Sequence, residues 1–184
     1  MYDFRSRPAS AKSLVHSIVH LGDDLVGIEL GVFEAINFCY LLQSCPNIKT
    51  LHGIDAYKPY EDFVYGGQVV DEAKIEFVNM VAYHNIKFSG ESHRVQFHVM
   101  DTLAAVGKFA DESVDFIFQD AYLSYEQALQ ELKAWYPKLK KGGIYSGHDY
   151  NDPKVTRAVA DFRESERISA RMSVADDCWM WYKT

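Results

Sequence analysis

The sequence predicts an α/β fold, a three-layer sandwich in which a seven-stranded, mostly parallel sheet lies between helices. Helical and strand-like patterns alternate along nearly the whole chain, which favours a parallel sheet. Residues 114–119 are largely apolar, with Val114 and the run from Phe116 to Phe118, as expected for a central strand buried on both faces. Two short strand-like segments close the chain and predict an antiparallel C-terminal hairpin. The 184 residues suffice for one domain, which we expect to span residues 1–184.

The first elements follow from apolar spacing. Apolar residues at helical intervals between Leu14 and Leu21 predict an N-terminal helix within residues 1–22, and Gly22 suits its end. Residues 25–30 form the first strand. A helix follows from Ala35 to Leu42, and the second strand is expected at residues 50–54.

The helix–strand alternation fails between Ala56 and Gly67, where aromatic residues stand among polar ones. A helix over residues 69–85 and a strand over residues 94–99 then resume it. We expect residues 56–91 to be a variable lid or substrate region. The aromatic residues between Tyr57 and Tyr65 either cover a substrate or pack a long loop on the domain.

After the central strand, Ser124 and Gln127 form a capping box, and the following apolar residues lie on one helical face up to Trp135. Pro137 and the Gly142-Gly143 pair are expected to end that helix before a strand at residues 144–146. Asp152-Pro153 is a helix cap followed by a first-turn proline. The last two strands are expected at residues 168–174 and 178–183, joined at Asp176-Asp177.

Composition narrows the class of protein. The net charge of −7 argues against non-specific nucleic-acid binding, which needs basic surface. Cys39, Cys45 and Cys178 are an odd number without metal-ligand spacing, which is typical of free thiols in a reducing compartment. No segment predicts a signal peptide or a membrane span. We therefore expect a cytoplasmic domain that binds neither nucleic acid nor membrane.

Two strand ends predict a nucleoside site. The first strand ends at Glu29 and Gly31, and the second ends 26 positions after Glu29, at Asp55. A glycine lets a ligand approach the backbone, and an acidic residue at the next strand end can accept both hydroxyls of a ribose. Glu29 and Glu34 would repel phosphates and attract a cation, and the G-x-G-x-x-G of pyrophosphate sites is absent. A positively charged nucleoside without phosphate indicates S-adenosylmethionine.

Three segments then carry a family resemblance: residues 53–60 (GIDAYKPY), 124–126 (SYE) and 142–150 (GGIYSGHDY). With the βα order, they make the chain resemble the Rossmann-like class I S-adenosylmethionine-dependent methyltransferases. Within that superfamily it looks most like a bacterial small-molecule family with a GHDY motif, here residues 147–150. The resemblance runs from about Leu25 to the C-terminus.

The resemblance implies a role for each matching position. The first motif, which holds the methionine part of the cofactor, falls on Glu29, Gly31, Val32 and Phe33. Asp55, with Ala56 beside it, matches the ribose site, and Asp101 and Thr102 match the residues that meet the adenine amino group. Asp120 closes the fourth strand, where cofactor and substrate meet. Asp101 and Thr102 are also good helix caps, and the two roles are compatible.

Two positions depart from the family pattern. Ala35 stands where the first motif usually has a second glycine, which is a mild change. Leu123 stands where the family usually has a histidine able to act as base or ligand. The second departure weakens direct transfer of the family's mechanism.

The candidate catalytic and metal-binding residues stand at the ends of two adjacent predicted strands. Asp120 and Asp149 end adjacent strands of the predicted sheet, so their carboxylates can bind Mg²⁺ or another divalent cation, with Asn151 as a further oxygen ligand. The alternative is hydrogen bonding to cofactor, His148 and loop amides. His148 is the candidate catalytic base, with Asp120 beside it, because an imidazole suits proton removal near neutrality. A histidine packed against a carboxylate is the competing interpretation.

The sequence thus predicts a methyltransferase acting on a small hydroxylated molecule, as an O-methyltransferase. The alternative is a catalytically inactive module that binds S-adenosylmethionine or S-adenosylhomocysteine, and a nicotinamide-dependent oxidoreductase ranks third. Oxygen or nitrogen attack, metal dependence and a homo-oligomeric state stay open.

Overall fold

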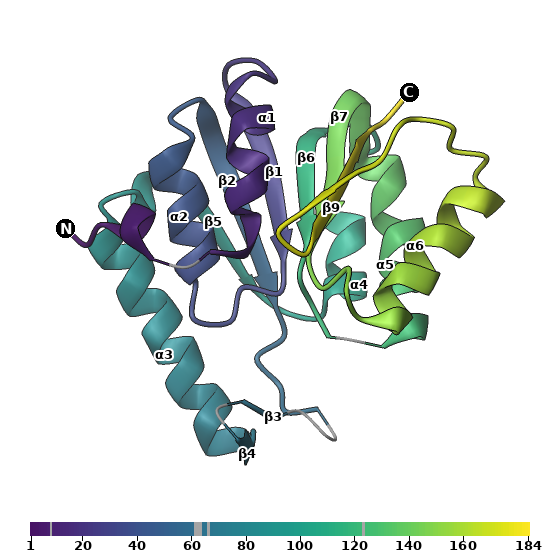
Figure 1. Cartoon of the computed structure of the whole chain (residues 1–184). Helices are drawn as coiled ribbons and strands as arrows, with labels where there is room; N and C mark the ends of the chain where they lie inside the picture. The colour runs from purple at the N-terminus through teal and green to yellow at the C-terminus, as the bar shows by residue number, and fades with distance from the viewer. Residues whose placement is uncertain (8, 61–63, 66, 123) are drawn as a thin grey trace.

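The computed structural model describes residues 1–7, 9–60, 64, 65, 67–122 and 124–184. A seven-stranded sheet runs through its centre in the order β5-β2-β1-β6-β7-β9-β8 (Figure 1). The strands are β1 (Leu25–Leu30), β2 (Ile48–Asp55), β5 (Val95–Val99), β6 (Val114–Gln119), β7 (Leu139–Gly147), β8 (Ser173–Ala175) and β9 (Cys178–Tyr182). The first five run parallel to one another, and β9 is antiparallel to both β7 and β8. The predicted fold class is confirmed.

Helices cover both faces of the sheet. They are α1 (Val15–Val19), α2 (Ile36–Ser44), α3 (Glu72–Ser89), α4 (Thr102–Ala105), α5 (Tyr125–Trp135) and α6 (Pro153–Ser165). One apolar core joins the first three helices to the sheet through residues such as Ile18, Phe38 and Ala82. The other joins the last three through residues such as Leu132 and Phe162. The central strands are therefore buried on both sides, as their apolar sequences require.

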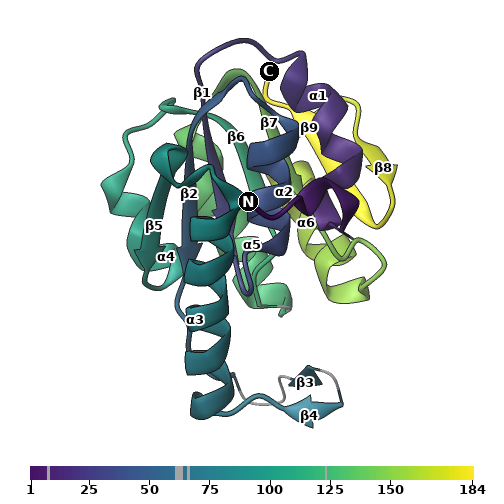
Figure 2. The ribbon, with the colours of Figure 1, turned by 90° about the vertical axis from the view of Figure 1, so that its left-hand side faces the viewer.

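At the N-terminus and in the lid region the structure differs in detail from the predicted elements. The helix expected from the apolar spacing of Leu14 to Leu21 is present as α1, and two 3₁₀ helices, Phe4–Ser6 and Ser10–Leu14, precede it. Helix α3 begins at Glu72, because the Asp71 side chain caps it by accepting from the Lys74 amide. Val69, the first residue of the predicted helix, instead belongs to a small hairpin of β3 (Val64–Tyr65) and β4 (Gln68–Val69). This hairpin and the start of α3 project from the domain body (Figure 2).

Two late strands also differ from prediction. β7 begins at Leu139, since Gly142 adopts φ +78° and the strand passes through the glycine pair with a register shift against β6. β8 covers only Ser173–Ala175, because residues 168–172 cross from α6 without pairing to a described strand. Helix α5 begins after the Ser124 cap as predicted, with the Ser124 hydroxyl accepting from the Gln127 amide. Within the described part of the chain, no helix combines the length and apolarity needed to cross a membrane.

Candidate active site

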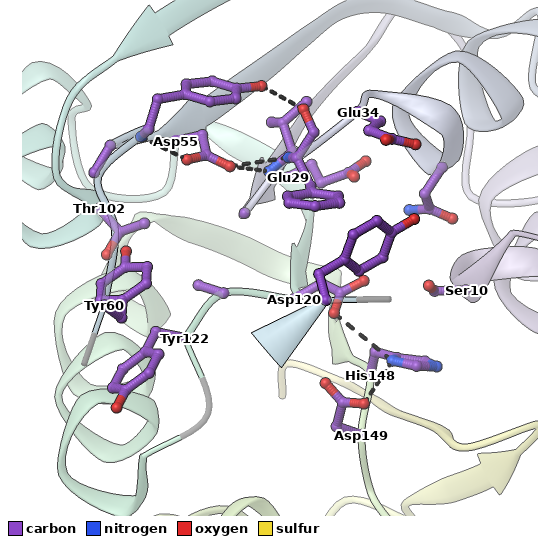
Figure 3. A pocket seen from close by; sticks show the side chains of 18 of the residues that line it. Ser10, Glu29, Glu34, Asp55, Tyr60, Thr102, Asp120, Tyr122, His148 and Asp149 are labelled. Carbon is purple, nitrogen blue, oxygen red and sulfur yellow. Dashed lines mark hydrogen bonds and ion pairs between the residues drawn. The ribbon is translucent and has the colours of Figure 1, made fainter. Parts of the chain in front are cut away.

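A cavity of about 780 Å³ opens at the carboxyl ends of the parallel strands (Figure 3). It lies where the sheet order reverses, between β1 and β6, which is the place where open α/β sheets bind ligands. Its size falls within the usual range for small-molecule sites, roughly 300–1,000 Å³. Most of the predicted site residues line it: Glu29, Gly31, Val32, Phe33, Asp55, Ala56, Thr102, Asp120, His148 and Asp149.

Glu29 is the buried acidic group at the floor of the cavity. It is 1% exposed, and its Oε2 has no hydrogen-bond partner among the described residues. Burial raises the pKa of Glu29 well above its usual value, the charges of Asp120 and Asp55 add to the rise, and Asn37 opposes it. A cation bound beside such a buried, unpaired carboxyl group would stabilise its charged form. An ammonium group is such a cation.

Gly31 is required by the fold rather than by the ligand alone. Its φ is +82°, and a Cβ at this position would lie 2.1 Å from the carbonyl oxygen of Asp120. The sequence predicts this glycine as a place for ligand approach. The structure adds a second reason, because the ends of β1 and β6 touch here and no side chain fits between them.

Asp55 holds the loop that follows β1. Its Oδ2 accepts from the backbone N–H groups of Val32 and Phe33, both at 2.9 Å, and its Oδ1 accepts from that of Tyr57 at 2.8 Å. A carboxylate has about four acceptor positions, so about one remains for a ligand. Asp55 thus lines the cavity and also holds the loop that follows β1.

Asp101 is the predicted cofactor residue that the structure does not bring to the cavity. Its carboxylate is exposed and caps α4, accepting from the amides of Leu103 and Ala104 at 2.9 and 3.0 Å. Of the described residues that line the cavity, Thr102 is the one that comes from this strand end. Asp101 therefore has the cap role, and Thr102 lines the cavity in its place.

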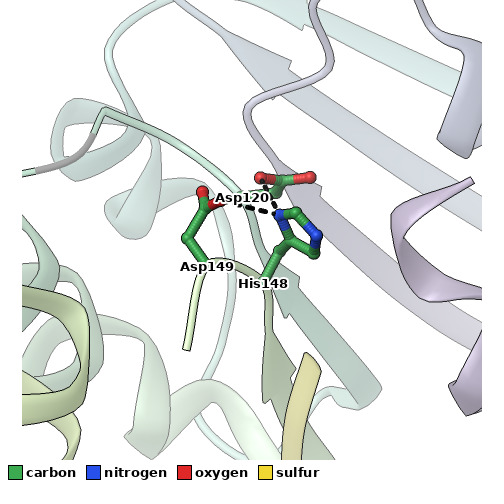
Figure 4. Close-up of side chains that lie close together, drawn as sticks. All are labelled: Asp120, His148 and Asp149. Atoms are coloured by element: carbon green, nitrogen blue, oxygen red, sulfur yellow. Dashed lines mark ion pairs between the residues drawn. The ribbon is translucent and has the colours of Figure 1, made fainter. Parts of the chain in front are cut away.

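Asp120, His148 and Asp149 line the cavity and lie close together, where β6 and β7 end (Figure 4). His148 Nδ1 lies 3.0 Å from Asp149 Oδ1 and 3.7 Å from Asp120 Oδ1. The hydrogen bond to Asp149 raises the pKa of His148, and burial raises the pKa of Asp120 to about 7. Asp149 adopts φ +56°, a left-handed conformation uncommon outside glycine. The strand end is held in this shape so that its carboxylate faces the imidazole.

Comparison with known proteins settles the family. A family model described as a methyltransferase domain matches residues 28–150. The chain belongs to this methyltransferase family. Its fold is that of the class I S-adenosylmethionine-dependent methyltransferases, as the resemblance implies. An uncharacterized protein of Acanthamoeba polyphaga mimivirus is 26% identical over 149 residues, and the match covers 77% of this chain and 62% of that relative.

Solved structures agree on the fold. A Corynebacterium glutamicum protein has a TM-score of 0.66 at 18% identity, covering 96% of this chain and 83% of that one. TomG, an O-methyltransferase of Streptomyces achromogenes in complex with S-adenosylmethionine, has a TM-score of 0.63 at 14% identity, covering 94% and 79%. The precorrin 8W decarboxylase of Methanobacterium thermoautotrophicum has a TM-score of 0.64 at 13% identity, covering 100% and 96%. The fold therefore serves more than one reaction.

Among the residues described, the chain carries one three-residue group suited to a metal ion. One ligand atom each from Asp120, His148 and Asp149 lie within 4.8 Å of one another. Asn151 does not join this group; it is exposed, and its backbone N–H donates to Asp177 at 2.6 Å. Two carboxylates suit Mg²⁺, and the imidazole shifts the preference toward Mn²⁺ or a similar transition metal. The donor set fits a divalent cation.

Aromatic rings line part of the cavity. Tyr60 stacks on Tyr122, with ring centroids 4.3 Å apart, and Phe33 meets Tyr65 edge to face at 4.8 Å. The Tyr57 hydroxyl donates to the Phe33 carbonyl at 2.6 Å. Tyr57 also packs against the apolar core, as the loop-packing alternative predicts, whereas Tyr60 and Tyr65 line the cavity and stay exposed. Phe63 and the departure at Leu123 lie outside the described residues.

Sequence reasoning missed Asn37 and Ser10, which also line the cavity. Asn37 is 9% exposed; its Oδ1 accepts from the Ala11 amide at 2.7 Å, and its Nδ2 has no partner among the described residues. The only available signal was an asparagine on the otherwise apolar start of α2. Ser10 reaches the site by the folding back of the N-terminal segment, which no local pattern reveals.

Proposed function

We propose that this protein transfers a methyl group from S-adenosylmethionine to a hydroxyl oxygen of a small molecule. The observation that carries the proposal is one cavity lined by two chemically different groups of residues. Glu29 and Asp55 provide acidic groups for a cationic nucleoside, and His148 with its two carboxylates provides a basic group that lines the same cavity. The O-methyltransferase fold neighbour TomG supports the same reaction class.

The residues divide the work between binding and proton removal. When bound, S-adenosylmethionine supplies a methyl group on a positively charged sulfur, which an acceptor oxygen displaces. Glu29 binds the ammonium group of the methionine part, away from the sulfur, so that it does not stabilise the ground state more than the transition state. The cavity walls align the acceptor behind the methyl group, and this placement accounts for much of the acceleration.

His148 takes the proton from the acceptor hydroxyl as the oxygen–carbon bond forms and the carbon–sulfur bond breaks. Its Nδ1 is oriented by the Asp149 carboxylate at 3.0 Å, which leaves Nε2 for the acceptor. The bond electrons go to sulfur, which becomes neutral. The proton remains on the imidazole, where the carboxylates of Asp149 and Asp120 stabilise its charge.

A test separates binding from chemistry. In His148→Asn, methyl transfer to a panel of phenols, catechols and sugars should fall roughly 100- to 10,000-fold, the range typical of general base loss. Affinity for S-adenosylhomocysteine, measured by calorimetry, should stay within about threefold. His93→Gln, at an exposed histidine, is the control and should keep full activity.

Two results would contradict the proposal. Equal turnover in His148→Asn and wild type removes His148 from the mechanism. Tight binding of S-adenosylhomocysteine without methylation of any acceptor in the panel favours the inactive binding module.

A divalent cation is a second candidate for the same role, favoured by the convergence of Asp120, His148 and Asp149. Bound there, it would lower the pKa of the acceptor hydroxyl. Calorimetric titration of wild type and Asp149→Asn with Mn²⁺ and Mg²⁺ distinguishes the two. Turnover that persists in excess chelator assigns proton removal to His148 alone.

A further inference from the structure

The outward face of α3 is apolar, and the proposed reaction does not use it. The inward face of this helix is buried through residues such as Ile75, Val78 and Ala82. On the other side of the helix, Phe77 and Met80 are 50% and 61% exposed. The solvent face of an amphipathic helix normally carries charged and polar residues. Helix α3 therefore has two apolar faces, and the domain covers one of them.

The exposed residues form a continuous line along the helix. Ala73, Phe77, Met80, His84 and Phe88 follow one another at intervals of three or four residues, so they share one face. All five are exposed. A row of this length spans about 22 Å of helix.

The N-terminal segment adds one ring to this face. Tyr2 stacks on Phe88 with ring centroids 5.4 Å apart, and its hydroxyl lies 3.3 Å from His84 Nε2. Figure 2 shows α3 in front of the sheet, with its first turns beyond the domain body. Exposed apolar surface that extends over several turns is typical of an interaction site. We call it the α3 stripe, and its residues are Tyr2, Ala73, Phe77, Met80, His84 and Phe88.

The charges beside the α3 stripe are ordered along the helix. Glu76 stands toward its N-terminal end and Lys87 toward its C-terminal end, and about three turns separate them, so they lie on the same flank. Lys87 Nζ lies 5.8 Å from the centroid of the Phe88 ring, at the edge of the stripe. On the other flank, Lys74 Nζ lies 5.8 Å from the ring centroid of Tyr65 in the hairpin. The flank with Glu76 is therefore acidic first and basic last.

We propose that the α3 stripe is the interface of a homodimer, in which two copies pack α3 antiparallel across a two-fold axis near Met80. In this arrangement Glu76 of each copy faces the turn that carries Lys87 of the other copy, so two ion pairs flank the apolar contact. Phe77 of each copy packs between His84 and Phe88 of the other, as a knob enters a hole. The antiparallel order also brings the N-terminus of each helix beside the C-terminus of the other, which favours their dipoles.

The charge of the chain favours a second copy over a lipid surface as the occupant. The net charge is −7, and the anionic lipids of a membrane surface attract basic segments. Glu76 beside the α3 stripe would face those anionic headgroups, whereas a second copy places Lys87 there. The six residues of the stripe do not line the cavity, so this inference is independent of the proposed function.

Sedimentation equilibrium of this chain tests the interface. The mass should rise from 21.1 kDa at about 5 μM toward twice that value at about 500 μM, because one pair of helices forms a small and weak interface. In Met80→Glu the dissociation constant of the dimer should rise at least tenfold. Val174→Glu, at a residue of β8 with 49% exposure, is the matched control and should dimerise as wild type does. A wild type that stays monomeric at every concentration overturns the inference.

A charge swap tests whether the partner is a second copy in the antiparallel order. Glu76→Lys alone, or Lys87→Glu alone, places like charges together and should weaken dimerisation at least tenfold. The double variant Glu76→Lys/Lys87→Glu restores opposite charges in both pairs and should recover the dimer to within about threefold of wild type. A double variant as weak as the single ones overturns the inference.

Circular dichroism distinguishes loss of the dimer from loss of the fold, since each variant should keep the wild-type spectrum. If Met80→Glu unfolds, the charge swap decides. Dimerisation that persists in a folded Met80→Glu assigns it to another face and overturns the inference. So does a chain that stays monomeric and binds phosphatidylcholine–phosphatidylserine vesicles through Met80, because the α3 stripe is then a lipid contact.

Discussion

At the scale of single residues, the site depends on positions where the backbone takes a conformation that side chains disfavour. Gly31, Phe33 and Ala35 all have positive φ within five residues. For Ala35, φ is +58° and the methyl group is fully buried, so packing holds an alanine where the family pattern has a glycine. These residues direct the N–H groups of Val32 and Phe33 toward Asp55. The strained loop is thus the link between the β1 and β2 ends.

Gly31→Ala should be strongly destabilising, by about 3 kcal/mol or more, because the new Cβ meets the Asp120 carbonyl as well as taking a left-handed φ. Gly142→Ala is a matched control, since Gly142 has φ +78° and a Cβ added there would have nothing within 4 Å among the described residues. In Gly142→Ala the free energy of unfolding should fall only by the cost of a left-handed φ for alanine, about 1 to 2 kcal/mol. Urea unfolding measures both, and equal losses would contradict the clash.

At the scale of elements, the sequence predicts best where local chemistry and tertiary packing agree. β1 and β6 match their predicted bounds because long apolar runs in this context have no other stable place than the sheet centre. Helix α5 matches because its cap is encoded in Ser124 and Gln127. The 3₁₀ helices before α1 could not be predicted, because distant groups hold that segment; Gln43, for example, accepts from the Phe4 amide at 2.7 Å.

The residues of the candidate site also divide into those that a local pattern predicts and those that only tertiary packing places. Glu29, Asp55 and Asp120 stand at strand ends, and parallel strands bring their carboxyl ends to one edge, so their approach could be predicted. Asn37 lies on a helix, and only the packing of α2 decides what it faces. Asp101 was predicted to face the ligand, but the cap of α4 takes its carboxylate.

A histidine pair links two of these strands and gives a pH dependence. His52 on β2 stacks on His98 on β5, with Nδ1 and Nε2 3.1 Å apart. Burial, with the neighbouring imidazole, lowers the pKa of His52 to about 4, below the value of about 6.5 in an unfolded chain. The unfolded state therefore takes up the proton first as pH falls, and stability is lost between about pH 6.5 and pH 4.

The loss assigned to His52 between pH 7 and pH 5 should be about 1 kcal/mol, after a discount for partial exposure. Comparing urea unfolding of wild type and His52→Gln at the two pH values isolates this loss from Glu131 and Asp120, whose raised pKa values act in the opposite sense. His93→Gln should keep the wild-type dependence. An identical pH dependence in His52→Gln would exclude this assignment.

At the scale of the whole molecule, the cavity lies between the two halves of the sheet, and carboxylates from both halves come close together in it. Glu29 and Asp55 come from the half with β1 and β2, and Asp120 comes from the half that begins with β6. Without a ligand their charges oppose one another across the switch point. We expect a cationic nucleoside to reduce this repulsion. The free energy of unfolding should therefore be larger with the ligand bound than without it.

Glu29→Gln should therefore change free and bound stability in opposite directions. The free protein should unfold at an equal or higher temperature, because a buried acidic group near two others is replaced by a neutral amide. At a concentration 100 times the wild-type Kd, S-adenosylhomocysteine should stabilise wild type by about 2.7 kcal/mol, which is about 5–10 °C for a chain of this size. If the variant binds 100-fold more weakly, the same concentration stabilises it by only about 0.4 kcal/mol. Thermal unfolding with and without ligand measures both effects, and a less stable free variant with an unchanged ligand shift would make Glu29 a structural residue instead of the group that binds the ammonium.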